Sequence, residues 1–331
     1  MVDTRNRDKM KLQGVIGCVK SFKKRFYRKS QSAMEYLMTY GWSILIIVIV
    51  LAAFTFLGVF NSIAFSPKAN PGNCQVVRPL GVGTTTEMGL SGTCNNQIPK
   101  YVATFSQSPA GYVHASQSIS SNSAQQITIS FWIDPKNNGL WGASGNYWEG
   151  AVSGGNGVGC WGNFYFFIES GGSPPSESWS ITGGASSARD FPGKKLIPNT
   201  WQQLAATYNG VDLAVYYNGA LIPSSVVACS NCLGDYPYLT ISGNNPTSNG
   251  GGCNPISGGM ANVQIYGKSL SSTTINALYK EGIGGVPINI QSLIAWYPLN
   301  GDTNDYSGNQ DNGVQNNVTF ISNWYNDYSS P

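Results

Sequence analysis

An uninterrupted apolar run near the N-terminus constrains this chain more than any other feature. The 25 residues of the segment 36–60 include no charged side chain. As an α-helix with a rise of about 1.5 Å per residue, the run is long enough to cross a hydrocarbon core of about 30 Å. It is also longer than the roughly 7–15 apolar residues of a secretory signal peptide. We therefore predict one transmembrane helix rather than a buried helix of a soluble core.

The charges on the two sides of this run differ. Residues 1–30 carry ten Lys and Arg against two Asp, whereas residues 31–331 carry nine Lys and Arg against fourteen Asp and Glu. Because cationic flanking segments stay in the cytoplasm, we expect the leader 1–30 inside the cell and the C-terminal part outside. The exported part is mildly acidic and poor in charge, which argues against nucleic acid as a partner.

The junction between leader and helix resembles a processing signal. Arg28, Lys29 and Ser30 precede QSAMEYLMTYGWSILIIVIV, which is similar to the class III signal peptide of archaeal type IV pilin-like proteins. The resemblance implies that a prepilin-type peptidase cuts between Ser30 and Gln31, although the family usually has Gly where Ser30 stands. It also implies that Glu35 pairs with the N-terminal amine of a like subunit in a filament. A simple single-span anchor is the alternative.

Six of the seven cysteines follow the apolar run, and Cys18 lies in the leader. An even number of cysteines on an exported domain indicates disulfides. Six cysteines allow 15 connectivities. Among these we expect the pairs Cys74–Cys94, Cys160–Cys253 and Cys229–Cys232.

The segment 101–285 has the pattern of an all-β domain. Apolar and polar residues alternate in QQITISFWI, and Asn-Gly pairs at 209–210 and 218–219 separate further alternating runs. Asn-Gly between such runs predicts a hairpin, because both residues tolerate positive φ. Only SLSSTTINALYKEG is typical of a helix, with Ser or Thr for its N-cap and Gly282 for its end. Many short strands with even spacing predict a jelly-roll β-sandwich.

The same stretches resemble laminin G-like, concanavalin A-like jelly rolls. Residues 201–208 match the pattern Trp-x-x-[LV]-A-x-[TV]-[YF], and residues 259–279 match the closing phrase of such domains. The resemblance implies adhesion, with carbohydrate or protein ligands, far more often than catalysis. The segment 293–313, LIAWYPLNGDTNDYSGNQDNG, resembles their first strand but comes last here. It closes the sheet in cis, begins a truncated second domain, or donates a strand to a neighbouring subunit.

These observations give a mainly β fold class, with a jelly-roll β-sandwich ectodomain on a single N-terminal transmembrane or pilin-type α-helix. The expected parts are a basic leader that is cleaved (1–30), the hydrophobic helix (31–60), a neck with a small Cys74/Cys94 module (61–100), the jelly roll (101–285) and a C-terminal strand segment that completes it or begins a truncated repeat (286–331).

Aromatic residues in or beside Gly-, Asn- and Ser-rich stretches are candidates for ligand binding, because ring faces stack on sugars. They are Trp141, Tyr147, Trp148, Trp161, Trp179 and Tyr236. Trp132 and Trp201 fall in regular strands and are expected in the core.

A Gly-rich stretch near the C-terminus offers hard oxygen ligands for calcium, chiefly Asp302, Asp305 and Asp311. Such residues are also ordinary in turns, so a calcium-free loop is the alternative. Asn317 begins Asn-Val-Thr, the sequon for N-glycosylation.

No catalytic residue is expected. A glycosidase needs two carboxylates about 5.5 Å or more apart, whereas Glu149, Glu169 and Glu177 are scattered singly, and His114 is expected in a surface loop. We interpret the chain as a pilin-like, membrane-anchored or filament-forming cell-surface protein that binds an extracellular glycan or surface protein in adhesion. The alternatives are a membrane-anchored polysaccharide-active enzyme and a ligand-free structural envelope protein.

Overall fold

The computed structural model describes residues 38, 40–56, 68–95, 97–115, 126–136, 147–154, 164–170, 177–183, 189–191, 196–228, 238–243 and 254–331. The chain forms two compact units, Met1–Phe65 and Ser66–Pro331.

In the first unit, residues 40–56 are helical and lie inside the predicted membrane segment. Within the described ranges, no helix has both the length and the apolarity that a bilayer crossing requires. The transmembrane helix over 36–60 therefore stays a prediction.

The second unit consists of short strands and little helix. Its elements are β1 (Lys68–Ala69), β2 (Cys74–Val77), β3 (Gly89–Gly92), β4 (Ile98–Pro99), β5 (Val102–Phe105), β6 (Tyr112–Ala115), β7 (Ile127–Pro135), β8 (Tyr147–Gly154), β9 (Phe164–Ser170), β10 (Glu177–Gly183), β11 (Arg189–Phe191), β12 (Gln202–Tyr208), β13 (Asp212–Tyr217), β14 (Ala220–Leu221), η2 (Pro223–Ser225), β15 (Val227–Ala228), β16 (Leu239–Ile241), β17 (Asn254–Pro255), β18 (Gly258–Tyr266), α2 (Ser272–Lys280), η3 (Ile290–Ser292), β19 (Leu293–Tyr297), β20 (Val314–Asn316), β21 (Thr319–Ile321) and η4 (Tyr325–Asp327).

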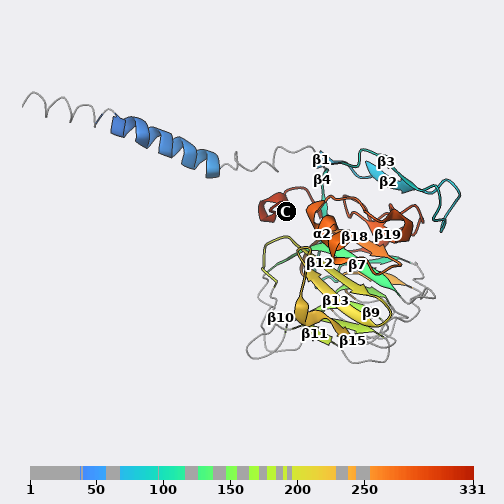
Figure 1. Ribbon diagram of the computed structural model, residues 1–331. Coiled ribbons are helices and arrows are strands. Elements are labelled where there is room, and N and C mark those ends of the chain that lie inside the picture. The colour runs from blue at the N-terminus through green and yellow to red at the C-terminus, as the bar shows by residue number, and fades with distance from the viewer. Residues whose placement is uncertain are drawn as a thin grey trace, which may run out of the picture. The chain divides into compact units, whose positions relative to one another are not determined.

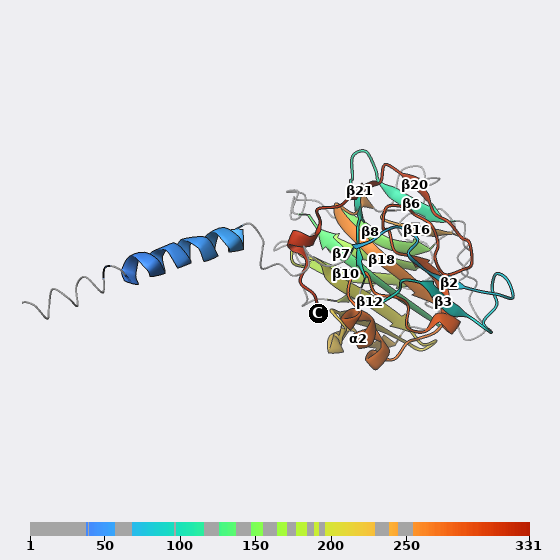
Figure 2. The same cartoon turned by 90° about the horizontal axis from the view of Figure 1, so that it is seen from above.

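Two large sheets form the sandwich (Figures 1 and 2). One has the order β11-β10-β9-β8-β16-β6-β20, with β17 beside β8, and the other has the order β14-β13-β12-β7-β18-β5-β21, with β15 beside β13 and β19 beside β18. Two small sheets, β1–β4 and β2–β3, precede them in the chain. The predicted mainly β sandwich is confirmed.

Strand β7 shows why alternation alone does not reveal how deeply a strand is buried. Ile129 and Phe131 belong to the core between the two sheets. The alternate residues face the other way, yet all nine residues of β7 are buried. A second apolar cluster, which includes Ile275 and Leu278 of α2, explains this, because it covers the outer face of the nine-stranded sheet. Trp132, expected in the core, is buried as predicted; it lies on that outer face and stacks on Tyr279 of α2.

The local sequence patterns predicted the turn at residues 218–219 and the helix α2 correctly. Asn218 and Gly219 both have positive φ between β13 and β14. A Cβ on Gly219 would lie 2.7 Å from Cβ of Tyr279, so helix packing also requires glycine there. The Ser271 side chain caps α2 by accepting a hydrogen bond from the Thr274 amide, and Gly282 ends the helical region with φ of 79°.

The C-terminal segment pairs within its own chain. Strand β19 lies antiparallel to β18, β20 pairs with β6, and β21 pairs with β5. The last two strands therefore each extend a different sheet of the sandwich. The domain boundaries expected at residues 100 and 285 stay predictions.

Candidate functional site

Many residues singled out in the sequence lie outside the described residues. This group comprises the processing and assembly residues, four cysteines and three aromatic residues: Ser30, Gln31, Glu35, Cys160, Cys229, Cys232, Cys253, Trp141, Trp161 and Tyr236. Their roles stay predictions.

The disulfide between Cys74 and Cys94 is confirmed. The Cα atoms lie 5.0 Å apart, and the bond closes a loop with a sequence separation of 20 residues. Cys74 begins β2, and Cys94 follows β3 by two residues. The bond therefore fastens together the two ends of the hairpin that β2 and β3 form.

Tyr147, Trp148 and Trp179 belong to strands of the eight-stranded sheet. Tyr147 is the first residue of β8, and the register pairs Trp148 with Glu169 of β9. Trp179 of β10 pairs with Ile168, the neighbouring residue of β9. The backbones at the two tryptophans thus lie on either side of β9, one step apart along it.

Two of the three aspartates proposed for calcium, Asp305 and Asp302, already accept hydrogen bonds from the chain. Both carboxylate oxygens of Asp305 accept hydrogen bonds, from the amides of Trp296 and Ser307 at Oδ1 and from the Ser307 hydroxyl and the Asp311 amide at Oδ2. Asp302 accepts from the Asn304 amide and the Tyr306 hydroxyl. In the described part of the chain, no three His, Cys, Asp or Glu side chains gather closely enough to hold a metal ion. Calcium binding at these residues stays a prediction.

A buried arginine fastens the β2–β3 hairpin to this loop. Arg78 donates to the carbonyl oxygens of Ser307 and Leu293 at 2.9 and 2.8 Å, and also to that of Thr84. Burial lowers the pKa of Arg78, and the charge of Asp305 opposes that shift. The hairpin and the C-terminal segment are therefore one hydrogen-bonded assembly.

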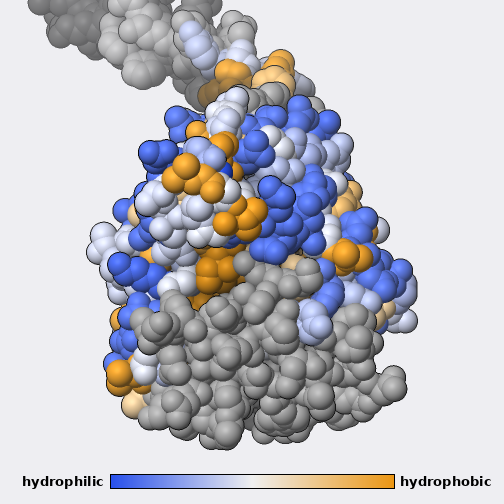
Figure 3. All heavy atoms as spheres, turned by 90° about the vertical axis from the view of Figure 1, so that its right-hand side faces the viewer, coloured by the Kyte–Doolittle hydropathy of each residue, from blue (hydrophilic) through white to orange (hydrophobic). Residues whose placement is uncertain are grey.

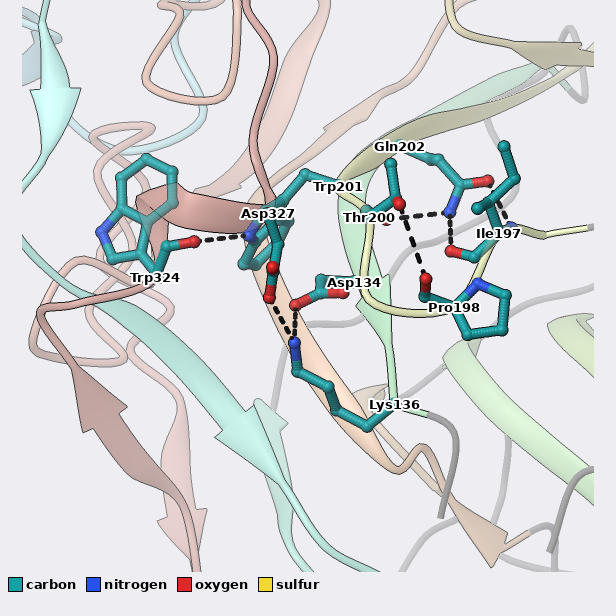
Figure 4. Close-up of polar contacts among 9 residues, drawn as sticks. All are labelled: Asp134, Lys136, Ile197, Pro198, Thr200, Trp201, Gln202, Trp324 and Asp327. Atoms are coloured by element: carbon teal, nitrogen blue, oxygen red, sulfur yellow. Dashed lines mark hydrogen bonds and ion pairs between the residues drawn. The ribbon is translucent and has the colours of Figure 1, made fainter. Parts of the chain in front are cut away.

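The chain end is held by a second polar cluster, shown in Figure 4. The Lys136 ammonium lies 2.5 Å from Oδ2 of Asp134 and 2.8 Å from Oδ2 of Asp327. Trp201 donates its amide to the Asp327 carbonyl and its indole N–H to the Trp324 carbonyl. We call these five residues the C-terminal clasp.

Burial raises the pKa of Asp134, while its hydrogen bond and charge interaction with Lys136 lower it. Burial of Lys136 alone would lower its pKa, but the two carboxylates outweigh that effect and raise it. Oδ1 of Asp134 is buried without a well-formed hydrogen bond. The Thr200 amide is close enough to lower the Asp134 pKa slightly without completing such a bond.

The only histidine of the chain is in a strand, so the expectation of a surface loop is wrong. His114 belongs to β6, which pairs on one side with β16 and on the other with β20. Its Nδ1 lies 3.3 Å from the Thr240 hydroxyl, and burial lowers its pKa. Both partner strands lie more than 100 residues away in the sequence, beyond the reach of a local pattern.

One pocket lies between the N-terminal and C-terminal flanks of the sandwich. It is a partly open pocket whose empty space of about 490 Å³ includes open solvent, and no lining residue carries a charge. The Cys74–Cys94 disulfide, Trp296 and Tyr306 are among its lining residues. We call it the flank pocket.

Sequence reasoning missed the flank pocket. Its wall residues Asn73 and Tyr306 are 233 positions apart in the chain numbering. The one available signal was Cys74, which was recognised as a disulfide partner and not as a pocket wall. No local motif links the two flanks.

The fold is that of the lectin-like β-sandwiches, with an uncharged pocket and without a metal cluster in the described residues. Residues 107–276, about half of the chain, match the model of the family described as the concanavalin A-like lectin/glucanases superfamily. The chain belongs to this family. No curated protein sequence matches it significantly.

Solved structures are similar at low sequence identity. A putative carbohydrate-binding protein from Bacteroides ovatus is 16% identical with a TM-score of 0.50, covering 77% of this chain and 70% of its own. A heptameric SAP-like pentraxin from Limulus polyphemus is 16% identical with a TM-score of 0.48, covering 68% and 97%. The sialidase of Trypanosoma rangeli is 14% identical with a TM-score of 0.38, covering 58% and 29%. The similarity to the Bacteroides ovatus protein supports the fold and nothing further.

Proposed function

We propose that this chain is a cell-surface protein that binds neutral glycans in adhesion through its lectin-like sandwich. The observation that carries the proposal is membership of the concanavalin A-like lectin/glucanases superfamily. The Bacteroides ovatus protein with a similar fold is described as a putative carbohydrate-binding protein, which supports the same ligand class. The low charge of residues 31–331 favours uncharged saccharides over anionic ones.

A glycan array probed with the full chain in detergent micelles tests this proposal. We expect binding to neutral oligosaccharides, and we expect the double substitution of Trp148→Ala and Trp179→Ala to weaken it, because aromatic faces stack on sugar rings. The matched control changes the same residues to Phe, which retains a ring. Absence of binding to every saccharide would favour a structural envelope protein without a ligand.

An enzymatic role is the weaker alternative. In the clasp, Asp134 and Asp327 lie close together, but the Lys136 ammonium contacts both carboxylates. Two carboxylates that neutralise one lysine are not a free acid and base of the kind that glycoside hydrolysis needs. An assay for released reducing sugar would detect activity if other residues supplied that pair.

The anchoring part of the proposal concerns the N-terminal unit. We propose that a prepilin-type peptidase processes the chain between Ser30 and Gln31, and that the helix anchors the protein or joins like subunits in a filament. The disulfide of the second unit supports an exported location, because such bonds persist in oxidising compartments. Electron microscopy of cells would test assembly, and Glu35→Ala is expected to lower filament yield while leaving membrane insertion intact. Normal filaments from this variant would contradict the assembly role.

Calcium binding near Asp302, Asp305 and Asp311 stays a prediction. An ion bound to Asp305 would compete with the four hydrogen bonds that its carboxylate accepts. A rise in Tm with added calcium that is lost in Asp302→Asn would support it, whereas an unchanged Tm would remove it.

Asn317 is exposed between β20 and β21, where it has φ of 47°. This position supports the proposal that its sequon is glycosylated. Mass spectrometry of the native protein would show whether a glycan is attached.

A further inference from the structure

The lining of the flank pocket combines buried or half-buried apolar groups with half-buried or exposed polar side chains. We call the apolar groups the floor: Val286, Pro99, the disulfide and Trp296, which is only 3% exposed. We call the polar side chains of Asn70, Asn73, Thr93 and Gln97 the rim. The indole N–H of Trp296 is already used, because it donates to the Asn262 side chain at 2.8 Å. The floor therefore offers a ligand apolar contact rather than hydrogen bonds.

The deeper carboxamides are also committed to the protein. Asn262 donates to the Gly285 carbonyl, and Asn300 donates to the Ala69 carbonyl while accepting from the Tyr101 amide. The two bonds of Asn300 hold the N-terminal and C-terminal flanks against each other. A ligand cannot use these groups without breaking the walls of the pocket.

The rim is different. Asn70, Asn73 and Thr93 also line the pocket, and in the described part of the chain their side chains form no hydrogen bond. Gln97 donates to the Asn95 carbonyl at 3.3 Å and has its Oε1 unengaged there. Carboxamides and a hydroxyl supply both donors and acceptors. The rim can therefore hydrogen-bond a neutral, polyhydroxylated ligand.

Two other classes of sugar match the lining of the flank pocket less well. A charged sugar would find no countercharge, because the lining contains no Lys, Arg, His, Asp or Glu. A plain hexose offers the floor only the C–H face of its ring. An acetamido group supplies a methyl for the floor and an amide for the rim, and burial of a methyl is favourable.

We propose that the flank pocket is a binding site for a neutral N-acetylated sugar, with the acetyl methyl on the floor and the polar groups at the rim. The choice of a saccharide rests on the proposed glycan-binding function. All but one of the lining residues lie outside the stretch 107–276 that matches the family, so the site is a feature of the flanks of this chain.

The surface around the β2–β3 hairpin carries no competing binding face of comparable definition. Val77, Leu80, Val82 and Leu90 are exposed there. From the side on which the hairpin lies, Figure 3 shows apolar residues in small groups with hydrophilic residues between them. The flank pocket is the better-defined site.

Calorimetry and saturation-transfer NMR with N-acetylglucosamine on the full chain in micelles test the proposal. We expect binding that is at least tenfold tighter than for methyl glucoside, no binding of N-acetylneuraminic acid, and saturation transfer strongest at the acetyl methyl. The double substitution of Asn70→Ala and Asn73→Ala should weaken binding about tenfold, since a neutral hydrogen bond contributes roughly threefold to tenfold in affinity. The control Asn95→Ala changes an exposed residue of the same segment that does not line the pocket.

The outcomes separate this inference from the proposed function. If N-acetylglucosamine binds equally well to the double variant, the pocket is not its site and the inference is overturned, while glycan binding stands. If the wild type binds other glycans on the array but not N-acetylated sugars, the inference about the flank pocket is overturned, while the proposed glycan binding stands. If it binds no saccharide at all, the proposed function fails as well.

Discussion

Two buried aspartates of the second unit are held in opposite ways. Asp305 is 8% exposed, and both of its oxygens accept hydrogen bonds from the chain. Asp134 is 3% exposed, contacts one lysine, and has one oxygen without a well-formed partner. The Asp305 carboxylate holds its own loop together through these hydrogen bonds. The negative charge of Asp134 is neutralised by a single side chain, Lys136, which is more than one-third exposed.

The difference follows from where each aspartate stands. Asp305 lies in a turn, where neighbouring amides converge on its carboxylate, so its charge is satisfied locally. Asp134 lies near the end of strand β7, where it pairs with Gly259 of β18. The backbone amides of a paired strand form hydrogen bonds within the sheet, so they do not converge on this carboxylate. Its charge must be neutralised by another side chain. Burial consequently raises the pKa of Asp134.

The largest effect is expected when the internal network is removed. Asp305→Ala deprives the amides of Trp296, Ser307 and Asp311 of their acceptor and takes a compensating charge from buried Arg78. Leaving several buried donors and one charge unsatisfied should lower the free energy of unfolding by about 3–5 kcal/mol. Urea denaturation measures this loss.

Asp302→Ala is the matched control for that loop. It removes two hydrogen bonds, from the Asn304 amide and the Tyr306 hydroxyl, but Asn304 is exposed. We expect a loss of about 1 kcal/mol or less. Equal losses of unfolding free energy in the two variants would show that the hydrogen bonds to Asp305 stabilise the fold no more than those to Asp302.

An intermediate effect is expected from the clasp. Lys136→Met removes the ammonium from Asp134 and Asp327, and it should cost about 1–2 kcal/mol at pH 8 because the pair is partly exposed. Without Lys136, less opposes the rise that burial causes in the pKa of Asp134. A raised carboxyl pKa means that protonation favours the folded state, so the deficit should shrink as pH falls from 8 to 5.

The double variant with Lys136→Met and Asp134→Asn checks that explanation. With no titrating carboxyl at residue 134, its stability relative to wild type should lose most of this pH dependence. A deficit of Lys136→Met that is the same at pH 5 and pH 8 would instead assign the effect to packing of the lysine stem.

The smallest effect concerns a third partly buried group, His114. Burial lowers its pKa, so the folded state favours the neutral ring. Stability from this group is present above the unfolded pKa of about 6.5 and is lost as pH falls below that value. His114→Gln should remove this loss, with a change in Tm of at most a few degrees between pH 7 and pH 5. The NMR titration of the single histidine is the direct measurement, and a pKa above 6.5 would contradict the expectation.

Local chemistry accounts for the parts of the fold that the sequence revealed. The φ preferences of Asn218 and Gly219, the cap at Ser271 and the alternation in β7 each act over a few residues. The Cys74–Cys94 disulfide was also predicted, between cysteines 20 positions apart.

The unpredicted parts depend on contacts between distant residues. The pairing of His114 with Val314 gives no signal in either segment alone, and the same holds for the clasp, where Lys136 meets Asp327. The flank pocket is a further case, because its floor and rim come from both sides of the sandwich sequence. The aspartates of the C-terminal loop were recognised as a cluster, but their hydrogen-bond donors were not foreseeable from spacing.

The pairing of the C-terminal strands has a consequence for the edges of both sheets. Strand β20 adds to one sheet, β21 adds to the other, and Trp324 and Asp327 lie against Trp201. Removal of residues 314–327 would therefore expose β6 and β5 as unpaired edges on both sheets at once. Unpaired edges are templates for pairing with another chain, so such a variant should aggregate.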